Sequence, residues 1–297
     1  MSQELQELQV IGVRYRGSTF AEDDERALDA YLESGVYAQA EVPFQVSEVR
    51  MPEARRVAFE PDNLGIINGE IAQAVAEALR AGRSVLMTGG DCTHATGMFG
   101  GLQDVYGADA RIGLVWFDAH GDFNTPGTTL SGMLGGMPVA VCAGLAYPRW
   151  RNESHIRAPL PTDRILFVDV RNLDAPEKQL IRATDAKIAA VADGFPGEKL
   201  QYALAHLSSR CDKIYFHIDS DILDESYVPN HGTKEPNGPN MQQVQDAITA
   251  VMATGKVVAA AVVSVYGSGE GRETSVASGI ELIRGLLHSW RRFGRAE

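Results

Sequence analysis

Two short acidic motifs in this 297-residue chain have the residue types and spacing of a metal-binding site. Asp118, His120 and Asp122 alternate in DAHGD, so an extended backbone places their three side chains on one face. Asp219 and Asp221 alternate in the same way in DSD. Four carboxylates and one imidazole in a small space repel one another unless cations offset their charge. Such donors suit divalent ions such as manganese, and two ions about 3.5 Å apart would acidify a bridging water.

Each motif alone also fits a loop cap with solvated acids, so the elements that position the motifs decide between the two interpretations. Helices are predicted from amphipathic periodicity at Gly69–Ala81, Gln242–Thr254 and Ser278–Arg292. Short apolar segments rich in Val, Ile and Phe predict six strands, at Leu8–Val13, Ser84–Thr88, Ile112–Phe117, Arg164–Val170, Lys213–Ile218 and Val257–Val265. This alternation predicts an α/β fold with a mainly parallel sheet covered by helices on both faces.

The sequences GGDCTH, DAHGD and DSD each follow one of these predicted strands. Because open parallel sheets bind ligands beyond the carboxyl ends of their strands, the three loops are expected to converge on one sheet edge. That convergence favours a metal site over isolated loop caps. The stretch from Leu32 to Pro61 is the least regular and is expected to form loops and short elements near the surface.

Composition narrows the possible partners. The chain has 39 acidic and 27 basic residues, and this excess of acids argues against broad binding of nucleic acid or of anionic membranes. Its longest apolar runs fall far short of the roughly 20 residues of a membrane span. The segment MSQELQELQV lacks the basic and apolar parts of a secretory signal. Three scattered cysteines, Cys92, Cys142 and Cys211, form no disulfide framework, so a cytoplasmic protein is expected.

Three ordered motifs resemble the signatures of the arginase/agmatinase ureohydrolase family. They are GGDCTH (89–94), DAHGDFNTPGTTLSG (118–132) and DSDILDESYVPNHGTKEPNG (219–238), and the resemblance extends over nearly the whole chain. It implies one three-layer α/β/α domain over residues 1–297. It also implies hydrolysis of a C–N bond in a guanidino or amidine group by hydroxide held between two Mn²⁺ ions. A homo-oligomer, trimeric or hexameric, is expected by the same resemblance.

The resemblance assigns the metal ligands. Asp118, Asp122 and Asp219 match ligands of one ion, and His120 and Asp221, together with Asp118 and Asp219, match the surroundings of the other. A further match, Asp224, lies just beyond these ligands and is expected to orient one of them.

Four further matches concern a small-molecule substrate with an amino-acid end. Asn124 and Ser131 match residues that bind an α-carboxylate, and Asp174 and Glu177 match acids that face an α-amino group. Polar residues after strands are also ordinary turn residues, so both interpretations remain open.

The first metal motif departs from the family pattern, because Cys92 stands where the family has a histidine ligand. A thiolate can bind a metal, but it is a softer donor that suits manganese poorly. If Cys92 does not ligate, the site holds one ion rather than two. His94 could replace the missing ligand in an extended segment, whereas in a helix its side chain would point away from Cys92.

Two other departures affect catalysis and specificity. Gly135 occupies the position of the family's proton-shuttle histidine, and His231 is the leading replacement unless it is an exposed loop residue. Ser264 falls where the family has a glutamate that pairs with the guanidinium, although Glu270 or Glu273 could fold back. Without that carboxylate the guanidinium lacks its planar partner, which favours a less basic substrate.

The cysteine and the missing histidine together resemble the Nω-hydroxy-L-arginine amidinohydrolase branch of the family. The sequence therefore predicts a metal-dependent hydrolase of a small guanidino, hydroxyguanidino or amidine compound, and Ser264 leaves the exact substrate open. Because three functional positions have changed, a non-catalytic member that binds metal and ligand is a second hypothesis. A hydrolase of a non-guanidine amide is a third.

Overall fold

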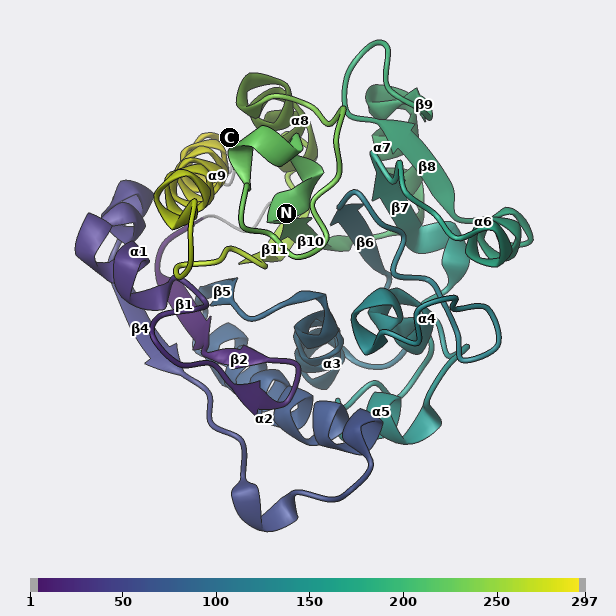
Figure 1. Ribbon diagram of the computed structural model, residues 1–297, viewed down its shortest axis with the longest axis horizontal. Coiled ribbons are helices and arrows are strands. Elements are labelled where there is room, and N and C mark those ends of the chain that lie inside the picture. Colours follow the sequence, from purple (N-terminus) through teal and green to yellow (C-terminus); the bar gives the residue numbers. More distant parts are fainter. Residues whose placement is uncertain (1–4, 294–297) are drawn as a thin grey trace.

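The apolar segments form the centre of one sheet in the computed structural model, which describes residues 5–293 (Figure 1). Nine strands lie in the order β4-β1-β5-β11-β10-β6-β7-β8-β9, and every neighbouring pair is parallel. The strands are β1 (Leu8–Val13), β4 (Phe44–Glu48), β5 (Ser84–Gly89), β6 (Ile112–Phe117), β7 (Ile165–Val168), β8 (Lys187–Ala190), β9 (Glu198–Lys199), β10 (Lys213–Asp219) and β11 (Val257–Val263). A small antiparallel hairpin joins β2 (Tyr15–Arg16) to β3 (Thr19–Phe20).

All six predicted strands are confirmed within a few residues of their expected ends. Strand β4 lies in the stretch that was expected to be irregular, and it pairs with β1 at one edge of the sheet. Its Phe44 and Val46 are exposed, so the strand lacks the buried apolar run that identified the central strands.

Nine helices surround the sheet within residues 5–293. They are α1 (Leu28–Ser34), α2 (Glu60–Arg80), α3 (Ala95–Tyr106), α4 (Pro138–Cys142), α5 (Pro148–Glu153), α6 (Ala175–Arg182), α7 (Leu200–Arg210), α8 (Met241–Met252) and α9 (Arg272–Phe293). Helix α2 begins at Glu60 rather than at the predicted Gly69, and Pro61 in its first turn favours that start. Helix α8 begins with a capping box between Asn240 and Gln243.

Helix α3 escaped prediction because of its glycines. A Cβ at Gly97 would lie 2.6 Å from the carbonyl oxygen of Asn68, and one at Gly100 would lie 1.7 Å from that of Ser154. These glycines let α3 pack closely against α2 and the segment after α5, at a cost in helix propensity.

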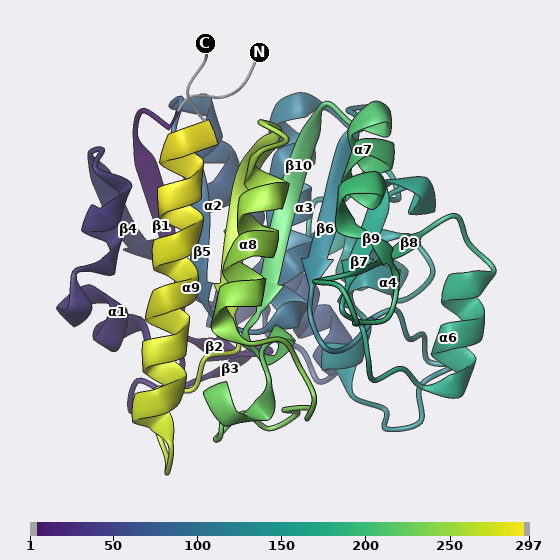
Figure 2. The same cartoon turned by 90° about the horizontal axis from the view of Figure 1, so that it is seen from above.

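The two faces of the sheet each pack against a layer of helices. On β6, Leu114 and Trp116 belong to the apolar cluster shared with α2 and α3, whereas Val115 and Phe117 belong to the cluster shared with α7, α8 and α9. Figure 2 shows α7, α8 and α9 in front of the sheet and α2 and α3 behind it. The predicted three-layer α/β/α architecture is therefore confirmed. Among residues 5–293, none of the helices combines the length and hydropathy needed to cross a bilayer.

Candidate functional site

The carboxyl ends of β5, β6, β10 and β11 surround a cavity of about 630 Å³. Residues of all three sequence motifs line it, among them Cys92, Asp118, Asp122, Asp219 and Asp221. The predicted convergence of the loops on one sheet edge is therefore present in the structure.

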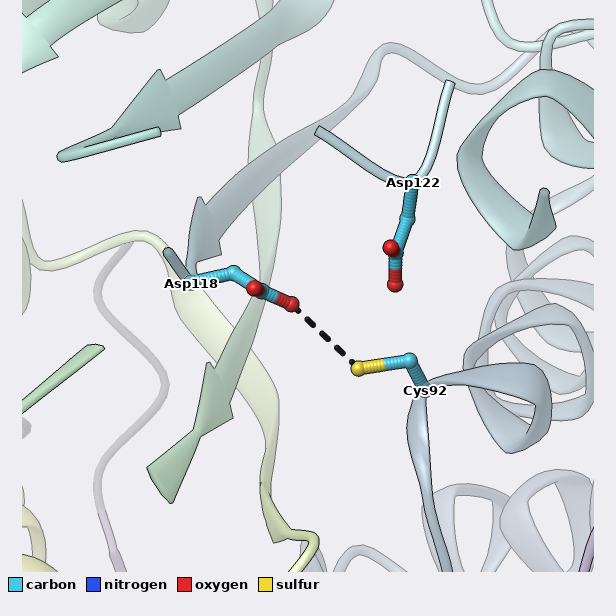
Figure 3. Close-up of side chains that lie close together, drawn as sticks. All are labelled: Cys92, Asp118 and Asp122. Atoms are coloured by element: carbon cyan, nitrogen blue, oxygen red, sulfur yellow. Dashed lines mark hydrogen bonds between the residues drawn. The ribbon is translucent and has the colours of Figure 1, made fainter. Parts of the chain in front are cut away.

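Cys92, Asp118 and Asp122 form one group that can hold a metal ion (Figure 3). Cys92 begins a 3₁₀ turn after β5, Asp118 follows β6 directly, and Asp122 lies in the next loop at a φ of 47°. One ligand atom from each lies within 4.8 Å of the others. The Cys92 Sγ atom is 3.4 Å from Asp118 Oδ2 and 3.0 Å from Asp219 Oδ2. Cys92 is thus placed where it can join carboxylates around one ion.

A second group consists of Asp118, His120 and Asp221. The Nδ1 atom of His120 lies 3.2 Å from Asp118 Oδ1 and 3.1 Å from Asp221 Oδ2. Asp221 lies in a 3₁₀ turn at the end of β10, where the Ala119 N–H donates to its Oδ1 atom at 3.1 Å. Asp118 belongs to both groups, as expected of a carboxylate between two ions.

His231 joins Asp219 and Asp221 in a third group. Its ring is only 5% exposed, so His231 is not an exposed loop residue. The Thr233 N–H donates to Nδ1 at 3.1 Å, and Nε2 lies 3.3 Å from Asp219 Oδ1 but makes no hydrogen bond. Because His231 lines the cavity, this nitrogen is available to a further group bound there.

The clustered carboxylates of the site favour the binding of cations. Burial, and then neighbouring carboxylates, raise the pKa of Asp118 well above its usual range, and burial likewise raises the pKa of Asp122. Burial opposes charge on His120, but Asp118 and Asp221 outweigh it and raise the His120 pKa. The cluster therefore retains protons that divalent ions would replace. With its shared carboxylates, the residue set fits a pair of divalent ions.

The four residues matched to an amino-acid end of the substrate also line the cavity. The Asn124 side chain donates from Nδ2 to Asp174 Oδ2 at 3.1 Å, and Ser131 lies on the exposed rim. Glu177 is 3% exposed and accepts the Phe123 N–H at 2.9 Å, and burial raises its pKa to about 7. Glu177 thus supports the loop after Asp122, whereas Asn124, Asp174 and Ser131 lie where a ligand could reach them.

The Arginase family model matches residues 6–288, which is nearly the whole chain. The chain belongs to the arginase family. The arginase of Bacillus caldovelox is 33% identical over 170 residues, 56% of each chain. Its solved native structure has a TM-score of 0.81 at 25% identity, covering 95% of this chain and 98% of that one. The arginase of Emericella nidulans is 27% identical over 308 residues, covering 95% and 94% of the two chains. A formimidoylglutamase structure from Bacillus subtilis has a TM-score of 0.70 at 14% identity, covering 97% and 88%.

One alternative ligand within the arginase family pattern, His94, is removed by the structure. Residues Cys92–His94 form a 3₁₀ turn rather than an extended segment. The His94 ring is fully buried, accepts the Asp91 N–H at Nδ1, and lies 3.0 Å from the Gly17 carbonyl oxygen at Nε2. His94 therefore holds the turn together and points away from the metal-binding groups.

The other two departures from the arginase family pattern leave space in the cavity. A Cβ at Gly135 would meet nothing within 4 Å, so the missing histidine is not replaced by another side chain at that point. Ser264 lines the cavity at a φ of 60°, and its backbone N–H donates to the Gly90 carbonyl. Glu270 and Glu273 are exposed and lie outside the cavity lining, so neither folds back.

The Asp224 carboxylate, which was expected to orient a metal ligand, makes its hydrogen bonds within its own loop. Its carboxylate accepts from the N–H and hydroxyl of Ser226 at 3.1 and 2.6 Å and from the Gly238 N–H at 3.2 Å. These bonds close the loop after β10 on itself and reach no metal-binding side chain. A carboxylate that caps its own loop satisfies backbone donors that would otherwise lack partners.

Sequence reasoning missed His217, which contacts Cys92, the cysteine of the first candidate metal group. The His217 Nε2 atom lies 3.3 Å from Cys92 Sγ, and its Nδ1 atom lies 2.8 Å from the Tyr215 hydroxyl. Burial lowers the pKa of His217 to about 3, so the ring is neutral. The two-residue period of the strand KIYFHID places His217 on the same face as Asp219, and that signal was available in the sequence.

Proposed function

We propose that this arginase-family chain is a two-metal hydrolase that cleaves a C–N bond of a small guanidino, hydroxyguanidino or amidine compound. The observation that carries the proposal is the meeting of four carboxylates, two imidazoles and one thiol at the floor of a single cavity. Hydrogen bonds offset only part of the repulsion among four buried carboxylates, whereas divalent cations offset their charge directly.

Two divalent ions, with manganese the expected metal, would be held by Cys92, Asp118 and Asp122 on one side and by His120 and Asp221 on the other. Asp219 lies between the Cys92 and His231 groups and contacts both. Bound there, the ions would lower the pKa of a water between them and so supply a nucleophile near neutral pH.

His231 is the side chain best placed to assist departure of the leaving nitrogen. Because its Nδ1 accepts the Thr233 N–H, the proton of the neutral ring is on Nε2, which lines the cavity without a hydrogen-bond partner. A donor held at a fixed position is the form that general acid catalysis requires. His231 thereby takes over a task that Gly135 cannot perform.

Two features bear on the substrate. The cavity wall presents Asn124, Ser131 and Asp174 to an amino-acid end, and these offer both donors and acceptors. At Ser264 the wall has a hydroxyl instead of a carboxylate, so the substrate's reacting group needs no full positive charge. A hydroxyguanidine, which is less basic than a guanidine, fits this wall.

The proposal is tested by metal analysis and product assays on the whole protein purified with manganese. We expect two ions per chain and one of three products from a substrate panel: urea from arginine or agmatine, hydroxyurea from Nω-hydroxy-arginine, or formamide from a formimino compound. Asp221→Asn should abolish turnover, and Asp246→Asn, the same change on the exposed face of α8, should not.

Full activity in Asp221→Asn would refute the proposal, and so would a wild-type protein that binds no metal. Thermal stabilisation by a panel compound without hydrolysis would instead identify a non-catalytic binding protein. Release of ammonia and a carboxylate without urea would identify an amide hydrolase.

A further inference from the structure

The two nitrogens of His120 face different groups. Nδ1 faces the carboxylates of Asp118 and Asp221 at 3.2 and 3.1 Å, which is the side on which an ion would lie. Nε2 faces away from them, toward Glu235, with 3.5 Å between Nε2 and Oε1. Glu235 lies in the loop after β10, within the third sequence motif, and the sequence assigned it no role at the metals.

Glu235 is held toward His120 by contacts of its own. The Asn172 side chain donates from Nδ2 to Glu235 Oε1 at 2.5 Å, and Asn172 pairs with His120 through a β-bridge. The Glu235 backbone carbonyl accepts from Arg171 Nη2 at 3.1 Å. The Glu235 side chain is 25% exposed and that of His120 is 22% exposed, so the pair is partly shielded from water. The carboxylate is therefore fixed beside the ring rather than free at the rim.

This arrangement determines which nitrogen of His120 carries its proton once an ion is bound. A neutral imidazole that binds an ion through Nδ1 must carry its proton on Nε2, and that N–H needs an acceptor. Metal-binding histidines generally donate this second N–H to a carboxylate or a carbonyl, which fixes the ring and strengthens the ligand. Glu235 Oε1 is the carboxylate oxygen that the structure places there.

We propose that Glu235 is a positioning residue that accepts the Nε2–H of His120 and thereby orients this ligand of the second ion. The inference rests on the proposed two-metal function, and it assigns Glu235 to the metal position that contains His120. Asn172 belongs to the same chain of contacts, because its amide holds the carboxylate in place.

Glu235 also lines the cavity, so a substrate cation is the competing partner for its carboxylate. The bond from Asn172 and the direction of the His120 ring favour the orienting role. The two roles differ in what they change: an orienting residue alters metal affinity, whereas a substrate-binding residue alters KM at constant metal content.

The test is titration of manganese into the metal-free whole protein by calorimetry, with the bound ions followed by electron paramagnetic resonance. We expect Glu235→Ala to weaken binding at one of the two positions by about 10- to 100-fold. Glu235→Gln keeps an amide oxygen that can accept the same N–H, so it should recover part of the loss. Asn172→Ala should weaken manganese binding at the same position, by a smaller factor.

Glu225→Gln is the matched control, because Glu225 is an exposed carboxylate of the same loop, and it should leave both affinities unchanged. Thermal melting of each metal-free variant checks that it is folded. Unchanged manganese affinity in Glu235→Ala, with or without a raised KM, would overturn the inference while leaving the two-metal function intact. A wild-type protein that binds neither manganese nor another divalent ion would instead remove the proposed function itself.

Discussion

Cys92 and His217 pack as a pair beneath the cavity, and the pair explains how the site accepts a cysteine. His217 stacks on Trp116 with a ring separation of 3.8 Å, and its Nε2 atom contacts the cysteine sulfur. Burial and the nearby Asp219 raise the pKa of the Cys92 thiol, so the sulfur keeps its proton until a cation is bound. Because the His217 imidazole lies against the Cys92 sulfur, a larger side chain at position 92 would overlap with it.

This packing predicts that Cys92→His alone will not restore a family-type ligand. An imidazole at position 92 would collide with His217, and such overpacking costs about 1–3 kcal/mol. The double variant Cys92→His/His217→Ser makes room and should bind manganese at the first position more tightly than either single variant. Manganese titration and thermal unfolding of all four proteins measure this coupling. Tight manganese binding by Cys92→His alone, at wild-type stability, would contradict the packing argument.

The open space at Gly135 predicts a gain of activity. Gly135→His adds an imidazole where a Cβ meets no atom within 4 Å, in a backbone that is not left-handed. A positioned general acid typically accelerates a reaction by about 100-fold or more. We therefore expect kcat on a guanidino substrate to rise in Gly135→His, by as much as about 100-fold. Gly136→His places the same ring one residue away and serves as the control. An unchanged kcat at unchanged metal content would show that His231 already supplies the proton.

At the scale of elements, one arginine fixes the loop that carries Asp221. Arg171 follows β7, and its guanidinium donates to the backbone carbonyls of Asp221, Ile222, Leu223 and Glu235 at 2.9 to 3.2 Å. The same group pairs with the buried Asp169 at 2.5 Å. Four carbonyls of one loop are thereby tied to the segment after β7, which lies two strands away from β10 in the sheet, and this positions the acidic turn at the end of β10.

Removing this arginine should therefore destabilise the protein strongly. Arg171→Leu leaves Asp169 buried without its partner, and breaking a buried ion pair typically costs about 3–5 kcal/mol. Urea unfolding measures the change, and Arg171→Leu/Asp169→Asn should recover part of it. Arg272→Leu breaks the ion pair of an exposed arginine with the exposed Glu273 and should change the free energy of unfolding far less. Equal losses in the two single variants would show that the loop does not depend on Arg171.

The elements also show what the sequence could and could not predict. Central strands such as β11, with seven buried residues, follow from hydrophobic runs, and the motifs after them follow from the edge they share. Helix α3 and strand β4 could not be predicted, because close packing required glycines in one and exposure removed the apolar pattern from the other. Contacts between loops, such as Glu235 with His120, depend on tertiary placement that no local period encodes.

At the scale of the whole molecule, the sheet edge concentrates buried acids where the rest of the fold has few. The carboxyl groups of Asp118, Asp122, Asp219 and Asp221 are each at most 7% exposed, and they come from two strand ends brought side by side by the pairing of β6 with β10. Folding without cations therefore places like charges together at a cost that the rest of the hydrophobic core must offset. Stability of the whole protein and occupancy of the site should be linked.

This linkage predicts a pH-dependent effect of metal removal. The pKa values of Asp118 and Asp122 are raised above their ordinary 3.8, so the metal-free folded protein binds more protons than the unfolded chain. Its free energy of unfolding then falls as the pH rises above that value. The raised pKa of His120 acts in the same direction above pH 6.5, whereas the lowered pKa of His217 opposes it below pH 6.5. Above pH 6.5 the contribution of His217 is complete, and the raised pKa values of the two aspartates, His120 and Glu177 all act in one direction, so the slope there is negative.

Bound manganese removes this penalty, and a concentration of about 100 times Kd adds roughly 2.7 kcal/mol per site. Urea unfolding at pH 5.5 and 7.5, with manganese or with a chelator, should therefore show a larger loss on chelation at pH 7.5. Asp122→Asn removes one titrating carboxyl and should flatten the pH dependence of the metal-free protein. Because metal binding must displace the retained protons, affinity should rise with pH over the same interval. A chelator effect of equal size at both pH values would mean that the buried acids are compensated without metal ions.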